Sequence, residues 1–305
     1  MKTSIVITAY NVEQYIAKSI ISAMQEGVDE IIIVEDKSTD NTLNVIKEIK
    51  EHSKSNIDIH IIINEENIGA GLSRRRGIEH CKNEYILLLD GDDYLDDNFI
   101  KALLDKAEKT DADIVSGGIK IIEKDGTWKA ESYGACIVEG NEKVSRFWGE
   151  RIVFMNNKLI RKKLYDLVPY NHRRFVEDTP TIIPILWYAN KVAYVDNIGY
   201  NYVMRDSSLT HTTNVIKDII YKGLCWLDLM DFFLEKDRTV FNYIDISGYI
   251  KNLLTIMNNI KTFDAAEINK YKDDWVEFTT RFFNLISINN INFKINEQNT
   301  STSNS

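Results

Sequence analysis

Residues 85–93 have the sequence YILLLDGDD, an apolar run that ends in Asp90, Asp92 and Asp93. A run this apolar predicts a β-strand buried on both faces, because a strand with one face in water alternates apolar and polar residues. Strands of that kind form parallel sheets covered by helices, and ligands bind to such sheets beyond the carboxyl ends of the strands. The three acids therefore lie where a ligand is expected.

The first 112 residues repeat this pattern, with apolar β-branched runs separated by amphipathic stretches. Such an alternation predicts an α/β fold with a Rossmann-like, mostly parallel sheet. Strands are predicted over 4–8, 30–34, 57–63 and 85–89, and helices over 12–25, 40–49, 71–81 and 98–109.

Beyond residue 112 the pattern changes twice. Residues 113–138 are strand-like with a turn at Asp125-Gly126, and helices are predicted over 161–167 and 179–189, with one or two strands over 192–203. Long helical stretches follow over 215–235, 242–260 and 264–285. We expect one domain over 1–213 that divides at 112/113, a helical C-terminal region over 214–290, and a disordered polar tail over 291–305.

The composition is that of an ordinary globular protein, with 44% hydrophobic and 27% charged residues. The formal net charge is -9, which disfavours a nucleic-acid partner because neutralised phosphates supply most nucleic-acid affinity. The three cysteines have neither zinc-ligand spacing nor the even number of a disulfide framework. No apolar stretch predicts a signal peptide or a transmembrane segment, so we expect a cytoplasmic protein.

The acids of residues 90–93 would repel one another, and a bound cation would relieve that repulsion. Carboxylate oxygens suit Mg²⁺ or Mn²⁺, which commonly link protein carboxylates to substrate phosphates. The alternative is a solvated turn, since Asp-Gly is a common turn dipeptide. The motif by itself leaves both interpretations open. A calcium loop fits less well, because residues 90–97 lack glycine at the sixth position.

Polar residues also follow the first two strands. Tyr10 and Asn11 could stack on and bond to a nucleobase, or could cap the next helix. Asp36 could accept hydrogen bonds from a base or a ribose. For its neighbours Ser38 and Asp40, a turn and a helix cap are the favoured interpretation.

The third strand is followed by residues 67–77, NIGAGLSRRRG, which are rich in glycine and arginine. This stretch is neither the GxGxxG fingerprint nor a P-loop. Arg74 could still neutralise a diphosphate, although short arginine runs are often solvated helix faces.

Taken in chain order, four stretches resemble the family 2 glycosyltransferases, which have the GT-A fold. The stretches are ITAYN (7–11), VEDKSTDNT (34–42), NIGAGLSRRRGI (67–78) and EYILLLDGDDYL (84–95). The resemblance implies that residues 1–213 form the catalytic domain, with a nucleotide-binding half over 1–112 and an acceptor half over 113–213. It is close in the first half and looser in the second.

The resemblance also implies roles for the matching positions. Two departures from the family pattern are Glu35, where Asp is usual, and Arg75, where Asn is usual. The implied roles are nucleobase binding for Thr8, Tyr10 and Asp36, diphosphate binding for Arg74, ribose binding for Asp90, and metal binding for Asp92 as the second acid of the DxD motif.

Two later stretches extend the resemblance. In RFVEDTP (174–180), the Glu-Asp pair implies Asp178 as the catalytic base, with Glu177 as the second candidate. Asp178 also suits a helix cap before Pro180, and the two roles are compatible. In the stretch 200–211, Arg205 would contact phosphate and His211 would complete the metal shell, although a lone histidine is more often a surface or core residue.

The function implied is inverting transfer of a sugar from a nucleotide-sugar, in particular a UDP-sugar, to a hydroxyl of a glycan or lipid-linked glycan, with Mn²⁺ or Mg²⁺, in bacterial surface polysaccharide synthesis. One alternative is an Asp-nucleophile phosphatase, whose DxD motif also follows an apolar strand but usually has Thr or Val where this chain has Tyr94. The other is a non-catalytic protein that binds carbohydrate or nucleotide-sugar.

The aromatic residues of the last third leave the role of the C-terminal helices open. Core packing is the default for such residues. A homo-oligomer interface and a peripheral contact with the inner face of the membrane are the alternatives. These aromatic residues are Trp226, Phe232, Phe233, Trp275, Phe278, Phe282 and Phe283.

Overall fold

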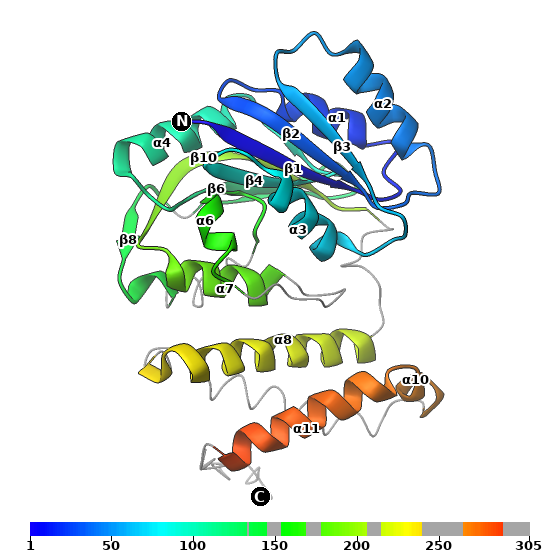
Figure 1. The fold of residues 1–305 in the computed structure, drawn as a ribbon, viewed down its shortest axis with the longest axis vertical. Helices are drawn as coiled ribbons and strands as arrows, with labels where there is room; N and C mark the ends of the chain where they lie inside the picture. The colour runs from blue at the N-terminus through cyan, green and yellow to red at the C-terminus, as the bar shows by residue number, and fades with distance from the viewer. Residues whose placement is uncertain (133, 145–153, 169–177, 206–214, 240–264, 289–305) are drawn as a thin grey trace, which may run out of the picture.

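The computed structural model describes residues 1–132, 134–144, 154–168, 178–205, 215–239 and 265–288. Within these residues, helices cover both faces of one mixed sheet of ten strands, and further helices form an additional layer (Figure 1). The predicted α/β fold, with a central, mostly parallel sheet and a C-terminal helical region, is confirmed.

Four parallel strands make one side of the sheet, in the order β3 (Asp58–Ile63), β2 (Val28–Glu35), β1 (Thr3–Ala9) and β4 (Tyr85–Asp90). Every residue of β1 is buried, as its apolar sequence predicts for a strand covered on both sides. All four strands therefore end at the same edge of the sheet, so the loops that follow them come together there.

The other side of the sheet contains a strand that the sequence pattern did not predict. β9 (Lys158–Arg161) lies between β4 and β6 (Ile114–Ile122) and is antiparallel to both. β10 (Lys191–Val203) is parallel to β6, and β5 (Tyr94–Leu95) is antiparallel to β10. Two short strands, β7 (Trp128–Glu131) and β8 (Ile137–Glu139), pair with β6 and β10 respectively.

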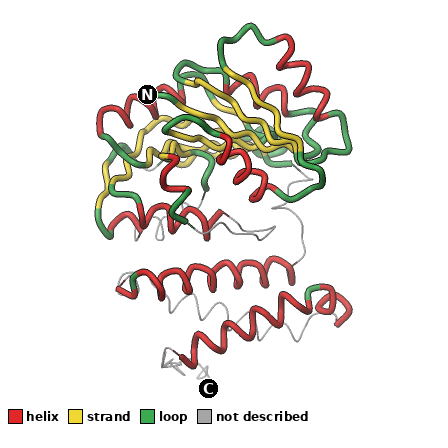
Figure 2. The backbone as a smooth tube through the Cα atoms, in the orientation of Figure 1, coloured by secondary structure: helices red, strands yellow, loops and turns green. Residues whose placement is uncertain are grey.

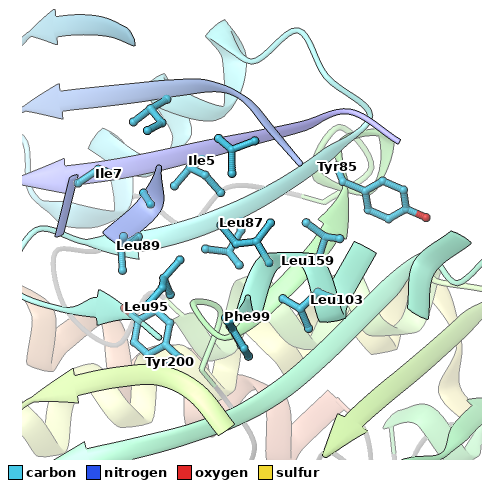
Figure 3. Close-up of a cluster of buried hydrophobic side chains, with 14 of the residues drawn as sticks. Ile5, Ile7, Tyr85, Leu87, Leu89, Leu95, Phe99, Leu103, Leu159 and Tyr200 are labelled. Carbon is cyan, nitrogen blue, oxygen red and sulfur yellow. The ribbon is translucent and has the colours of Figure 1, made fainter. Parts of the chain in front are cut away.

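The two faces of the sheet carry separate hydrophobic clusters, because successive side chains of a strand point to opposite faces. On β1, Ile5 and Ile7 belong to one cluster and Val6 to the other. Figure 3 shows part of the first cluster, where Phe99 and Leu103 approach the sheet. The first cluster includes residues of α1 (Ile16–Ala23), α2 (Thr42–His52) and α4 (Phe99–Thr110); the second includes residues of α3 (Ala70–His80), α6 (Lys162–Tyr165) and α7 (Asp178–Tyr188).

The C-terminal helices extend the second face outward. α8 (Val215–Lys236) packs on α7, and α11 (Lys272–Ile288) packs on α8 after the short helix α10 (Ala265–Lys270) (Figure 2). Four of the seven aromatic residues named above are buried, so core packing is their main role; Phe283 is exposed. None of the described helices is long and apolar enough to cross a membrane. The helix predicted over 242–260 and the tail over 291–305 lie outside the described residues.

The first helix begins later than the sequence pattern indicates, at Ile16 rather than Val12. Asn11 has a left-handed backbone with φ of 50°, and the N–H of Tyr15 donates to the carbonyl of Val12 at 2.9 Å in a turn. The chain therefore makes a tight turn after β1 before it becomes helical. This turn keeps Tyr10 and Asn11 at the carboxyl edge of the sheet.

Candidate active site

The ends of β1, β2 and β4 bring the first predicted site residues together. Thr8 is opposite Asp90 in the sheet, and its hydroxyl donates to Asp90 Oδ1 at 3.3 Å. The N–H of Gly91 donates to the carbonyl oxygen of Thr8 at 2.9 Å. A Cβ on residue 91 would lie 2.8 Å from that oxygen, so the close approach of the two loops requires glycine.

Arg74, from α3, joins two carboxylates that lie far apart in the sequence. Its Nη2 donates to Asp90 Oδ1 at 2.9 Å, and its Nη1 donates to Asp178 Oδ1 at 2.9 Å. The arginine side chain is 7% exposed, against 22% for Asp90 and 29% for Asp178. Asp178 is the first residue of α7. One buried cation thus holds the candidate base beside the candidate ribose ligand, and a direct contact of Arg74 with a diphosphate stays a prediction.

Two residues that sequence analysis did not select complete the surroundings of Asp90. The amide Nδ2 of Asn156 donates to Asp90 Oδ2 at 2.7 Å and to the hydroxyl of Tyr200 at 3.2 Å. That hydroxyl donates to Asp93 Oδ2 at 2.6 Å. Asn156 lies two residues before β9, where no local motif marks it, and Tyr200, within β10, begins the stretch 200–211 but was assigned no role there.

Asp92 faces Arg205, whose Nε donates to Asp92 Oδ2 at 2.5 Å. Burial, and then the charge of Asp90, raise the pKa of Asp92 above the ordinary value of an aspartate, while the guanidinium of Arg205 opposes that rise. Arg205 also lies over the ring of Tyr15, at 5.7 Å from its centroid. Negative charge is therefore concentrated here, and cations stabilise it.

The same carboxylates fit a divalent cation by their chemistry. Mg²⁺ and Mn²⁺ take oxygen ligands, and Mg²⁺ is often held by only one or two carboxylates together with substrate phosphates. Asp92, with Asp90 nearby, could supply that share of a coordination shell. No group of three or more His, Cys, Asp or Glu side chains that could hold a metal ion occurs among the described residues. Both His211 and Glu177 lie outside them.

Asp36 shapes the loop after β3. Its Oδ1 accepts from the N–H of Ile68 at 2.9 Å and from Asn64 Nδ2 at 2.7 Å, and its Oδ2 accepts from the N–H of Gly69 at 2.8 Å. Asp36 is buried, whereas Tyr10 is 43% exposed at the same edge of the sheet. A contact of Asp36 with a nucleobase would use its remaining lone pairs, and it stays a prediction.

The residues that depart from the family pattern have structural partners. Glu35 Oε1 accepts from the N–H of Ser38 at 2.5 Å and so closes the turn after β2. Arg75 turns away from Asp90, because its Nε pairs with Glu79 at 2.7 Å and its Nη1 donates to the carbonyl of Tyr165. The turn interpretation holds for Asp40, whose Oδ1 accepts from the N–H of Thr42, but the N-cap position of α2 is Asn41 and not Asp40.

A fully buried lysine lies beside this site. The ammonium of Lys158, at the start of β9, donates to Asn157 Oδ1 at 2.7 Å and to the carbonyl of Phe154. Burial lowers the pKa of Lys158 to about 7, against the opposing negative charge of Asp178. Lys158 is therefore a buried titratable group whose charge is influenced by that of the candidate base.

Comparisons with known proteins agree with this arrangement. The family model described as glycosyl transferase family 2 matches residues 4–173. The chain is 26% identical over 289 residues to the glycosyltransferase GlyG of Streptococcus pneumoniae serotype 4, which covers 88% of this chain and 92% of GlyG. It is 33% identical over 134 residues to the poly(ribitol-phosphate) beta-glucosyltransferase of Bacillus spizizenii, which covers 43% of this chain and 21% of that enzyme.

The structure is also similar to that of residues 1–349 of S. aureus TarS in complex with UDP-GlcNAc. The TM-score is 0.65 at 20% sequence identity, and the match covers 92% of this chain and 80% of that chain. The two structures thus share their fold.

Proposed function

This chain belongs to glycosyl transferase family 2, has the GT-A fold and is a glycosyltransferase, and from that premise we propose that it transfers a sugar from a UDP-sugar to an acceptor hydroxyl with inversion. The family match favours this class over an Asp-nucleophile phosphatase. The donor assignment is supported by the UDP-GlcNAc bound to TarS, which has the same fold.

The observation that carries the proposal is the bridge from Asp90 through Arg74 to Asp178. A glycosyl transfer by direct displacement requires a base on the acceptor side of the reacting carbon and a binding site for the leaving nucleotide on the other. The bridge links a carboxylate of the β4 loop to a carboxylate at the start of α7. Those two carboxylates suit the donor side and the acceptor side respectively.

In the reaction that we propose, Asp178 removes the proton of the acceptor hydroxyl while that oxygen attacks the anomeric carbon. The new bond forms as the bond from that carbon to the phosphate oxygen breaks, so the nucleoside diphosphate leaves with the electron pair. Arg205 would stabilise the negative charge that develops on the diphosphate. A divalent cation held by Asp92, with His211 as a further ligand, would act as a Lewis acid on the same oxygens. Thr8, Tyr10 and Asp36 would bind the nucleobase.

For the acceptor we propose a hydroxyl of a cell-surface glycan, including lipid-linked precursors or a polyol-phosphate chain. Relatives are named as a poly(ribitol-phosphate) beta-glucosyltransferase and as a putative teichuronic acid biosynthesis glycosyltransferase, which supports this class. Such work would take place in the cytoplasm, at the inner face of the membrane. The exposed side of α11 around Phe283 is a candidate for contact with that surface or with a second copy.

Calorimetry of UDP binding with and without Mn²⁺, followed by assays of UDP release from UDP-sugars with acceptor present, tests the proposal. We expect UDP to bind in a metal-dependent manner and one UDP-sugar to be consumed only when an acceptor is added. Binding without turnover of any sugar donor would instead favour the non-catalytic alternative. Absence of UDP binding in the presence of Mn²⁺ would contradict the donor assignment.

A further inference from the structure

Asp93 behaves differently from the other two acids of the β4 loop. It is 2% exposed, and both of its carboxylate oxygens accept hydrogen bonds from β10. Oδ1 accepts from the N–H of Val203 at 2.9 Å, and Oδ2 accepts from the hydroxyl of Tyr200 at 2.6 Å. Burial, and then the charges of Asp92 and Asp90, raise the pKa of Asp93 well above the ordinary value of an aspartate, while these two hydrogen bonds oppose that rise. Asp93 therefore points into the sheet, whereas Asp92 pairs with Arg205.

The hydrogen bonds that Asp93 accepts fix the end of β10 that lies just before Arg205. Tyr200 and Asn201 pair with β5, which directly follows Asp93. Val203, the last residue of β10, is held by Asp93, and the N–H of Met204 donates to the carbonyl of Ile122 at 3.0 Å. Arg205 is the next residue, so these bonds set the point from which its side chain reaches Asp92.

The hydroxyl of Tyr200 connects the contact between Asp93 and β10 to the rest of the site. It donates to Asp93 and accepts from Asn156 Nδ2, which also donates to Asp90. The tyrosine ring is completely buried beside Leu95 and Phe99 (Figure 3). Because packing fixes the ring, the hydroxyl has one position, and that position aligns Asp93 with β10.

We propose that Asp93 and Tyr200 are positioning residues that fix Arg205 opposite Asp92, and that Asp93 is not a ligand of the divalent cation. This proposal rests on the proposed function, in which Arg205 stabilises the leaving diphosphate. In this proposal Asp93, the third acid of residues 90–93, holds β10 in place and does not bind the metal ion.

A double-mutant cycle between Tyr200→Phe and Arg205→Gln tests the positioning role. Tyr200→Phe keeps the buried ring and removes only the hydroxyl. We expect it to weaken Mn²⁺-dependent UDP binding about tenfold, the scale seen when a residue that orients a ligating group is lost. In the Arg205→Gln background the same change should have less than about a twofold effect, because residues that act through one another are not additive.

Tyr85→Phe is the matched control. Tyr85 belongs to the same hydrophobic cluster, is equally buried, and donates its hydroxyl to the carbonyl of Ala112 at 2.6 Å, away from the site (Figure 3). The Tyr85→Phe protein should lose thermal stability, as the Tyr200→Phe protein does, but should keep the wild-type affinity for UDP. An effect of Tyr200→Phe on UDP binding that is equal in both Arg205 backgrounds, or no larger than that of Tyr85→Phe, would overturn the positioning role.

Asp93→Asn tests the second part of the proposal. The asparagine can still accept from Val203 and pair with Tyr200, but it cannot ionise and so cannot act as an anionic metal ligand. With UDP bound, Mn²⁺ affinity measured by electron paramagnetic resonance should change less than about threefold in Asp93→Asn and more than about tenfold in Asp92→Asn. A loss in Asp93→Asn as large as that in Asp92→Asn would show that Asp93 is a ligand. Wild-type protein that binds no UDP with Mn²⁺ would contradict the proposed function itself, whereas additivity in the cycle would contradict only the positioning pair.

Discussion

Replacing Arg74 by methionine should destabilise the protein strongly, although the change keeps most of the volume of the side chain. The substitution removes the cation between Asp90 and Asp178 and leaves two carboxylates without it. Breaking a buried ion pair by removing one partner costs about 3–5 kcal/mol. The side chains of Asp90 and Asp178 are 22% and 29% exposed, so water screens part of their charge. We therefore expect the lower end of that range, about 3 kcal/mol.

Thermal unfolding followed by circular dichroism measures this effect. A loss of about 3 kcal/mol corresponds to a fall in Tm of roughly 6–12 °C for a domain of this size. Arg74→Lys should give a smaller fall, because an ammonium cannot donate in the forked geometry that reaches both carboxylates. Salt should change these differences little, since buried pairs are screened less than exposed ones.

Arg75→Met is the matched control on the same helix. Arg75 forms an exposed-side pair with Glu79 one turn along α3, and such pairs contribute about 0.3–0.5 kcal/mol. If Arg74→Met lowers the Tm no more than Arg75→Met does, the bridge does not hold the two carboxylates together in solution. Arg74 would then not align Asp178 with the donor side of the site.

Three further predictions concern single side chains. Asp178→Asn should slow transfer by about 10²–10⁴-fold and leave UDP affinity nearly unchanged; a wild-type rate would place the base elsewhere. Asp92→Ala should abolish the metal-dependent part of UDP binding, and calorimetry that gives equal affinities for variant and wild type would contradict its role. Burial lowers the pKa of Lys158 from 10.5 to about 7, so the unfolded state binds more protons between these values and stability should rise with pH there. Wild-type and Lys158→Met proteins with the same pH dependence of unfolding would refute this.

The first four strands could be predicted from the sequence because their apolar runs are long enough to be recognised without tertiary context. β9 could not, because its four residues, Lys158–Arg161, carry no pattern of their own and become a strand only by pairing on both sides. The helix predicted to begin at Arg161 begins one residue later, at Lys162, as α6. The prediction therefore assigned Arg161, the last residue of β9, to a helix. Short segments of this kind take their structure from their neighbours.

The candidate site was likewise only partly predictable from the sequence. The resemblance selected Thr8, Arg74, Asp90 and Asp178, and the structure brings their side chains together, while their roles in catalysis stay predictions. The direct pairing of Arg74 with Asp178 could not be predicted, since it depends on how α3 and α7 pack on one face of the sheet. Asn156 was missed because an asparagine in a loop has no local pattern that marks a site residue. Tyr200 begins the stretch 200–211, but it received no role because sequence alone does not distinguish a site tyrosine from a core tyrosine in a strand.

During synthesis, β4 emerges from the ribosome well before β9 does, and β9 must then insert between β4 and β6. Until β9 arrives, β4 has an unpaired edge, and such an edge can pair with other chains. Pairings between segments far apart in the sequence also form slowly. A truncated product that ends at residue 112 would retain that open edge, so the predicted nucleotide-binding half, residues 1–112, is expected to aggregate when it is produced alone. Swapping that half between relatives would succeed only if the strand that closes it is transferred as well.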